Sequence, residues 1–229
     1  MIKKWLKVAI VISGSMGIAV ALKSSGLIPT LLYFTNMSNI LAAVVAGIFL
    51  YFDMSKKDVK PFFHILRFIS TSGIALTFVV FTTVLMPSVI LQGYANYLYS
   101  PSNIFLHNLT PILMMLDYML YARKEENKKV LYALVFPLTY LVFALTINPL
   151  TGVLFEGNLR VPYFFLNFYV NGWFTLNQGF LKIGAFWWII LIVPLVSLIG
   201  FILILVRRKG KIEYYNEQLK TLEQENLSN

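Results

Sequence analysis

The sequence contains no cysteine, only two histidines and few charged residues. Charged side chains make up 13% of its 229 residues, whereas a soluble domain has about 25%. Without cysteine there is no disulfide, thiolate metal site or cysteine nucleophile. The sequence also lacks HExxH, GxSxG and phosphate-loop motifs, so zinc, serine-hydrolase and nucleotide chemistry have no support. We therefore expect no metal and no cofactor.

Hydrophobic residues are abundant, at 58% of the chain, and the mean hydropathy is +0.72. A helix needs about 20 mostly apolar residues to cross the bilayer. Six segments qualify, at 5–23, 29–52, 66–92, 103–122, 130–149 and 184–206. They predict an all-α polytopic membrane protein: a six-transmembrane-helix bundle over 1–206, with a long outer loop at about 150–183 and a polar, helical tail at 207–229.

Positive charge is distributed unevenly between the two sides of these predicted spans. Sixteen of the nineteen lysines and arginines fall on the side that holds both termini. Cytoplasmic loops are enriched in these residues, so both termini are expected in the cytoplasm. The net charge of +9 then reflects topology and contact with anionic lipids, not nucleic-acid binding. Short loops and the lack of cysteine favour a bacterial cell membrane.

The first 25 residues allow two interpretations. A basic start, an apolar stretch and the A-x-A at Ala19–Ala21 also describe a cleavable signal peptide. Charge counting does not separate this alternative from a retained first helix, because the second span enters from the outside in both cases. We favour the retained helix.

Two polar clusters occur at similar depth in the second and fourth predicted spans. In "YFTNMSNI", Thr35, Ser38 and Asn39 share one helix face. In "NIFLHNLTPILMMLDYML", His107 lies about 7–8 Å below the outer edge at the rise of an α-helix. Pro111 removes the N–H that would bond the His107 carbonyl, so the helix is expected to bend there and to need a donor from a neighbour. Thr35 and His107 can therefore meet near the outer surface.

Asp117 lies on the same face as His107 but about 15 Å further along the axis. We expect it to pair with Arg67 or Lys124 and to be structural. In the long outer loop, Glu156 is the one acid that topology allows as a partner for His107. Many aromatic residues make that loop either an interfacial cap or a lid over the pocket, with Arg160 binding a fatty carboxylate.

"YFTNMSNIL" and "FLHNLTPILMMLDYML" resemble the two hallmark segments of the androgen-induced-gene family of multispan membrane proteins and its bacterial six-span relatives. "FPLTYLVFALTINPLTG" is similar to their fifth span and the loop after it. The resemblance covers most of the chain from the second span onward. Animal members are threonine hydrolases that act on fatty-acid esters of hydroxy fatty acids. The resemblance therefore implies a nucleophile at Thr35 and a base at His107.

Such a site would hydrolyse a lipid-like ester drawn from the surrounding membrane lipids. Neutral imidazole can take the proton of a threonine hydroxyl. Because backbone N–H groups inside a helix are already bonded, oxyanion donors are expected from side chains. The candidate donors and lining residues are Asn36, Ser38, Asn39, Asn103, Asn108 and Thr110. The alternatives are a non-enzymatic transporter, in which Asp117 joins His107 on a proton route, and a structural membrane protein without a site.

Overall fold

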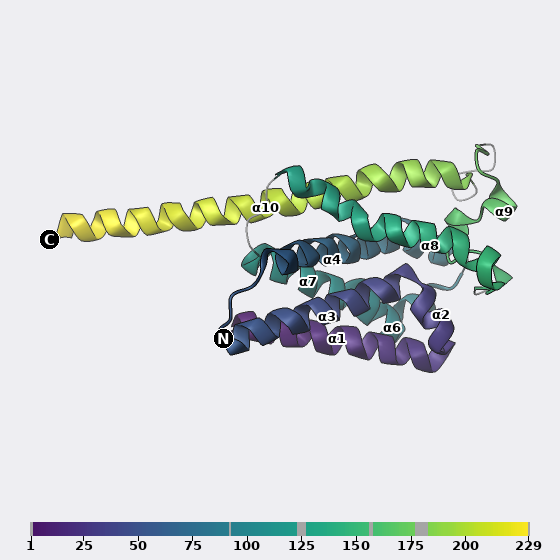
Figure 1. Ribbon diagram of the computed structural model, residues 1–229, viewed down its shortest axis with the longest axis horizontal. Helices are drawn as coiled ribbons and strands as arrows, with labels where there is room; N and C mark the ends of the chain where they lie inside the picture. Colours follow the sequence, from purple (N-terminus) through teal and green to yellow (C-terminus); the bar gives the residue numbers. More distant parts are fainter. Residues whose placement is uncertain (1, 92, 123–126, 156–157, 177–182, 229) are drawn as a thin grey trace.

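The computed structural model describes residues 2–91, 93–122, 127–155, 158–176 and 183–228. These residues form helices, turns and one isolated bridge between Phe155 and Leu159, without a strand. The helices lie side by side in an elongated bundle, from which α10 extends (Figure 1). We call the end where α2 and the connection 152–184 lie the loop end. The opposite end, where α1 begins, is the tail end.

Five helices of the described chain are long and apolar enough to cross a membrane. They are Ile2–Ser25, Phe34–Ser55, Pro61–Leu91, Lys129–Thr151 and Ala185–Arg207. The sequence therefore predicted the all-helical class and these five apolar helices correctly. They correspond to α1 (Ile2–Ser25), α3 (Phe34–Ser55), α4 (Pro61–Val80) with η1 (Phe81–Leu85) and α5 (Met86–Leu91), η4 (Asn127–Leu134) with α8 (Val135–Thr151), and the first half of α10 (Ala185–Ser228).

The segment predicted as a single span over 103–122 is divided into three helical pieces. These are α6 (Pro101–Asn103), η3 (Ile104–Leu109) and α7 (Thr110–Tyr121). The middle piece, η3, is a π-helix, in which Thr110 N–H donates to the carbonyl of Phe105, five residues earlier. A proline inside a helix lacks an N–H and its ring presses on the carbonyl four residues before it, and a wider turn relieves that contact. Pro111 is the second residue after η3.

The same pairing of π-helix and proline occurs in the third apolar segment. There η1 is a π-helix in which Met86 N–H donates to the carbonyl of Phe81, and Pro87 follows. Pro87 and Pro111 thus widen two helices, and these helices contribute neighbouring side chains to the site described below.

The start of the second apolar segment differs from the prediction of a continuous helix over 29–52. Gly26 has a φ of 78°, which reverses the chain after α1 into the short helix α2 (Leu27–Leu32). Tyr33 is extended, with φ −87° and ψ 138°, and α3 begins at Phe34. The boundary predicted at 29 was therefore wrong, and Thr35 stands in the first turn of a helix.

Helix α1 packs closely into the bundle through small residues. Gly14 and Gly17 are buried with Ser13 and Ala21 on one face of α1. A Cβ added at Gly17 would stand 2.6 Å from the Leu106 side chain of η3. Small side chains allow such close approach between membrane helices, where van der Waals packing drives association. The first apolar segment is thus a constituent of the bundle.

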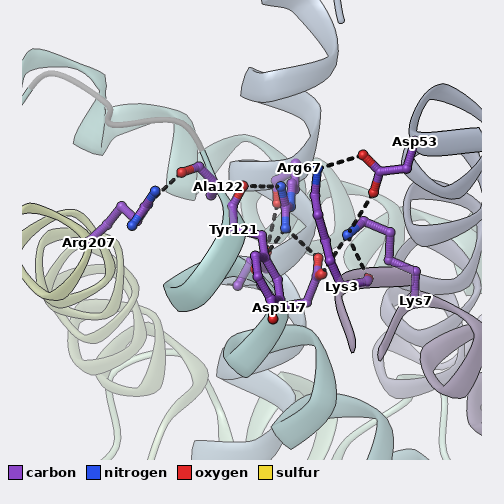
Figure 2. Close-up of polar contacts among 9 residues, drawn as sticks. Lys3, Lys7, Asp53, Arg67, Asp117, Tyr121, Ala122 and Arg207 are labelled. Carbon is purple, nitrogen blue, oxygen red and sulfur yellow. Dashed lines mark hydrogen bonds and ion pairs between the residues drawn. The ribbon is translucent and has the colours of Figure 1, made fainter. Parts of the chain in front are cut away.

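Buried ion pairs join four helices at the tail end (Figure 2). Lys7 Nζ of α1 lies 2.9 Å from Asp117 Oδ1 of α7 and 3.3 Å from Asp53 Oδ2 of α3. Arg67 of α4 pairs with the other Asp117 oxygen and also donates to the Asp117 carbonyl at 2.7 Å. Lys3 bonds Asp53 at 2.6 Å. We call Lys3, Lys7, Asp53, Arg67 and Asp117 the tail-end ion cluster.

The tail-end ion cluster confirms that Asp117 pairs with Arg67, while Lys124 lies outside the described residues. The sequence did not indicate Lys7 as a second partner. Lys7, Arg67 and Asp117 are almost completely buried. Two residues that had been counted as loop charges are therefore internal, which hydropathy and charge counting alone do not reveal.

The long connection between α8 and α10 turns back into the loop end of the bundle. It contains η6 (Phe164–Leu166) and α9 (Phe168–Asn171). Val161, Phe165 and Leu166 are buried in the main hydrophobic cluster with Phe34 and Trp188. The connection is therefore part of the core. Beyond the bundle, α10 continues as one helix to Ser228 (Figure 1), which includes the predicted helical tail.

Candidate functional site

The structure brings together the two residues that the sequence singled out at matched depth. Thr35 Oγ1 of α3 lies 3.3 Å from His107 Nε2 of η3. That distance is long for a hydrogen bond, as is common for catalytic pairs before substrate binds. The predicted contact between these two side chains is therefore present at the loop end.

The His107 ring is held on two sides. Its face stacks on Phe81 of the other π-helix, with ring centroids 4.0 Å apart and planes at 19°. Its Nδ1 is buried and faces the backbone of Asn103, although no hydrogen bond of standard geometry forms. A neutral ring with the proton on Nδ1 leaves Nε2 free to accept from Thr35. The packing thus suits His107 to act as a base.

Thr35 has a backbone N–H that does not take part in the helix. The first intrahelical acceptor of α3 is the Tyr33 carbonyl, which bonds Met37 N–H at 3.0 Å. Thr35 N–H instead donates to the phenol oxygen of Tyr163 at 3.3 Å. The expectation that backbone donors near Thr35 would all be occupied by the helix was wrong, because the break at Tyr33 leaves the first turn of α3 without intrahelical acceptors.

A cavity of about 370 Å³ opens beside this pair. Its walls come from α1, α3, η1, η3 and the long connection, and they include Thr35, His107 and Tyr163. Polar lining residues are Ser24, Ser25, Asn36, Ser102 and Asn103. We call it the polar cavity. It offers room for water and for a polar part of a ligand.

A second, smaller cavity of about 80 Å³ is also lined by Thr35 and Tyr163. Its lining is mostly aliphatic and aromatic, from α3, α4, α8, α10 and the long connection, for example Leu76, Pro137 and Val196. We call it the apolar cleft. Thr35, Leu85 and Tyr163 line both spaces. The hydroxyl of Thr35 therefore stands where a polar and an apolar space meet.

Among the predicted amide donors near Thr35, only Asn36 and Asn103 line the polar cavity. Asn36 Nδ2 already donates to the Thr30 carbonyl at the end of α2, at 2.7 Å. Asn39 is completely buried, and its Nδ2 donates to the carbonyls of Thr35 at 2.7 Å and Leu106 at 2.9 Å. Asn39 therefore joins α3 to η3 and does not face the cavity, which corrects its predicted lining position.

The Leu106 carbonyl explains why Asn39 is needed. In an α-helix this carbonyl would accept from Thr110 N–H, but in η3 that N–H bonds Phe105. Asn39 Nδ2 takes its place. The sequence predicted that Pro111 would free the carbonyl of His107 for a neighbouring donor. The carbonyl that Asn39 binds is that of Leu106, one residue earlier.

The remaining predicted lining residues make helix contacts instead. Ser38 Oγ bonds Thr77 Oγ1 of α4 at 2.8 Å, and Thr110 Oγ1 donates to Ser13 Oγ of α1 at 2.9 Å. Asn108 Nδ2 donates to the Asn103 carbonyl at 3.5 Å. Ser38, Asn108 and Thr110 are not among the residues that line the polar cavity. Buried hydroxyls commonly join membrane helices in this way.

The two predicted substrate-binding residues of the long connection have different outcomes. Arg160 is exposed and its guanidinium lies 5.0 Å from the centre of the Tyr169 ring. It does not line the polar cavity, although Leu159 and Pro162 beside it do. Glu156 lies outside the described residues. Other residues of the long connection, such as Leu159 and Pro162, line the polar cavity.

Tyr163 is the site residue that the sequence did not indicate. It was one aromatic residue among many in a segment without periodicity, and only folding places it on Thr35. Tyr140 of α8 likewise supports the site, because its hydroxyl donates to the Leu32 carbonyl beside the break between α2 and α3, at 2.9 Å. Pro87 and Pro111, which lie close after the two π-helices, are a local signal in the sequence near this region.

Comparison of the chain with protein families, with curated proteins and with solved structures finds no match. The fold and site together define a class: an all-helical protein with several helices that could span a membrane, and with a threonine–histidine pair between a polar and an apolar space.

Proposed function

We propose that the chain is a six-span protein, with Pro101–Tyr121 as its fourth span and both termini in the cytoplasm of a bacterial cell. Two observations support this topology. Pro101–Tyr121 is helical throughout, although it is divided. Even without the buried Lys7 and Arg67, fourteen lysines and arginines fall on the side of the termini and three on the other. The loop end would then face outward.

The proposed activity is hydrolysis of fatty-acid esters from the membrane, with Thr35 as nucleophile and His107 as general base. The observation that carries it is the contact of 3.3 Å between Thr35 Oγ1 and His107 Nε2, located where the two spaces meet. A nucleophile next to a base that is itself held in place is the arrangement expected for covalent acyl transfer. No nucleic acid, metal or cofactor takes part, and membrane lipids are the expected partners.

The steps follow from this arrangement. Thr35 Oγ1 attacks the ester carbonyl carbon while its proton moves to His107 Nε2. The carbonyl electrons return from the resulting oxyanion, the alkoxide leaves, and it takes the proton from His107. Water then attacks the acyl-threonine with His107 again accepting a proton, the bond between the acyl carbon and Thr35 Oγ1 breaks, and His107 returns the proton to Oγ1. The products are a fatty acid and an alcohol, and Thr35 is restored.

The two spaces support this class of substrate. The acyl chain would lie in the apolar cleft, whose lining includes Leu138 and Val193 of α8 and α10. The alcohol portion and the attacking water would occupy the polar cavity. A chain between α8 and α10 would enter from the bilayer, without crossing water.

The first prediction concerns covalent labelling of Thr35. Purified wild-type protein in lipid nanodiscs is expected to react with an alkyl fluorophosphonate. The Thr35 oxygen attacks the phosphorus atom and displaces fluoride. Thr35→Ala is expected to lower labelling to background, because this variant lacks the hydroxyl that lies 3.3 Å from His107 Nε2. Labelling is measured by gel fluorescence, and the modified peptide by mass spectrometry.

Thr146→Ala is the matched control for this experiment. Thr146 is an exposed threonine of α8 whose hydroxyl bonds its own helix at 2.8 Å, and it lines neither space. Full labelling is expected in this variant. Labelling that survives Thr35→Ala, or a wild type that does not react, would remove the hydrolase proposal.

A second prediction concerns Arg160. Arg160 is exposed and follows Leu159, which lines the polar cavity, and its guanidinium can bind the free carboxylate of a substrate. Arg160→Ala is expected to lower kcat/KM by about tenfold for carboxylate-bearing esters, which corresponds to about 1.4 kcal/mol, and to leave neutral esters unaffected. Steady-state hydrolysis of matched ester pairs measures this ratio. An equal loss on both esters would contradict a carboxylate-binding role.

The transporter alternative assigned Asp117 to a proton route with His107. Asp117 instead has both carboxylate oxygens on cations, Lys7 and Arg67, in the tail-end ion cluster. That pairing supports a structural role for Asp117, so we do not propose a proton route.

A further inference from the structure

The side chain of Tyr163 reaches Thr35 from the long connection. Its phenol oxygen accepts from Thr35 N–H at 3.3 Å and also contacts the Thr35 side chain and the Phe34 backbone. It lines both the polar cavity and the apolar cleft. The phenol therefore stands beside Thr35, within reach of a carbonyl that binds next to the Thr35 side chain.

The position of this phenol is fixed by its neighbours. The Tyr163 ring stacks on Phe165, with centroids 5.1 Å apart and planes at 12°, and meets the edge of Tyr33 at 5.8 Å. Phe165 is itself buried in the core. These contacts hold the ring of Tyr163 beside Thr35.

Burial also keeps the phenol protonated. It raises the pKa of Tyr163 to about 12, so the hydroxyl is neutral and can donate a hydrogen bond at any physiological pH. Thr35 N–H supplies a second donor, because it lies in the first turn of α3 and has no intrahelical acceptor. An anion near the start of a helix is further favoured by the helix dipole.

We infer that the Tyr163 hydroxyl and the Thr35 backbone N–H form the oxyanion hole of this site, which makes Tyr163 a further catalytic residue. The inference rests on the proposed hydrolase function. When Thr35 attacks, the carbonyl π electrons move onto the ester oxygen, which accepts hydrogen bonds from both donors. Both protons stay on their donors, and the electrons return to reform the carbonyl when the alkoxide leaves.

In the structure without substrate, the phenol oxygen itself occupies the acceptor position of Thr35 N–H. The carbonyl oxygen of a bound ester replaces it there, and the hydroxyl then points its proton at that oxygen. The predicted amide donors are not needed: Asn36 is bonded to Thr30, and Asn39 joins two helices.

The test is Tyr163→Phe in the full-length protein, which removes one oxygen and keeps the ring. We expect kcat for a fatty-acyl ester to fall by about 10²–10³-fold, with KM changed by less than about threefold, because the lost interaction exists only in the transition state. Affinity for an alkyl boronic acid, which forms a tetrahedral adduct with Thr35, is expected to fall by the same factor. Affinity for a non-hydrolysable ether analogue is expected to stay unchanged.

Tyr169→Phe is the matched control, since Tyr169 lies on the same connection and lines neither space; its kinetics are expected to match the wild type. Wild-type kcat in Tyr163→Phe, with Thr35→Ala inactive, would overturn this inference alone. A wild type without turnover would overturn the proposed function as well. If Tyr163→Phe no longer binds the ether analogue, a variant with 3-fluorotyrosine at position 163 tests the inference instead. Its phenol is a stronger hydrogen-bond donor of nearly the same shape. Its kcat is expected to exceed that of the wild type, and a lower or equal kcat would overturn the inference.

Discussion

Replacing His107 with alanine is expected to lower kcat for ester hydrolysis by about 10³-fold, in the range that general base catalysis contributes. The imidazole is within reach of the Thr35 hydroxyl, with Nε2 at 3.3 Å from Oγ1. Without it the Thr35 hydroxyl loses its general base, and a neutral hydroxyl is a poor nucleophile. KM is expected to change little, since the ring faces Phe81 on one side. Steady-state kinetics in nanodiscs measures both constants.

Two further measurements separate this role from a packing role. His107→Ala leaves a space beside Phe81 that free imidazole can enter, so added imidazole is expected to restore part of the activity. The other histidine gives the matched control: His64 lies against Phe49 at the tail end, and His64→Ala is expected to retain wild-type kcat. A similar loss in both variants, or undiminished turnover in His107→Ala, would contradict the role of His107 as base.

The largest loss of stability is expected from Asp117→Ala. The Asp117 carboxylate is the common partner of Lys7 and Arg67, and all three side chains are almost fully buried. Removing it leaves two buried cations without this partner. Breaking a buried ion pair typically costs about 3–5 kcal/mol, because the unpaired charge remains in a medium of low dielectric. The free energy of unfolding, measured by denaturant titration in detergent, is expected to fall by about that amount.

Asp58 provides the comparison for this experiment, since it is an exposed acid near the same end of the bundle. Asp58→Ala is expected to change the free energy of unfolding by less than about 0.5 kcal/mol. Asp117→Asn keeps the shape of the side chain and loses its charge. It is expected to lower the free energy of unfolding by about as much as Asp117→Ala. A loss below about 1 kcal/mol in both Asp117 variants would show that the tail-end ion cluster contributes little to stability.

Hydropathy was sufficient to predict the five apolar helices. In a membrane, each apolar segment must form its backbone hydrogen bonds within itself, whatever surrounds it. Hydropathy was insufficient for their interruptions. The break at Tyr33 follows from contacts of α2 and Asn36, and the division of 103–122 depends on how Pro111 is accommodated by Asn39 of another helix. Both features change what the site can do, since one frees the N–H of Thr35 and the other places His107 in a π-helix.

The candidate site was predictable only in part. Thr35 and His107 could be selected because a polar group in an apolar helix is costly and needs a reason. Asn39 and Thr110 satisfied the same rule, yet they join helices. Periodicity places a residue on one face of its own helix, and it carries no information about which helix that face meets.

By itself, the sequence determined the helical class, five apolar helices and the two polar segments, because those properties depend on the composition of contiguous residues. Only the tertiary structure decided that Tyr163 from a distant connection bonds the backbone of Thr35, and that Lys7, Arg67 and Asp117 form a buried network. These contacts join residues far apart in the chain. Their energies depend on distance and burial in the packed bundle, which no local pattern specifies.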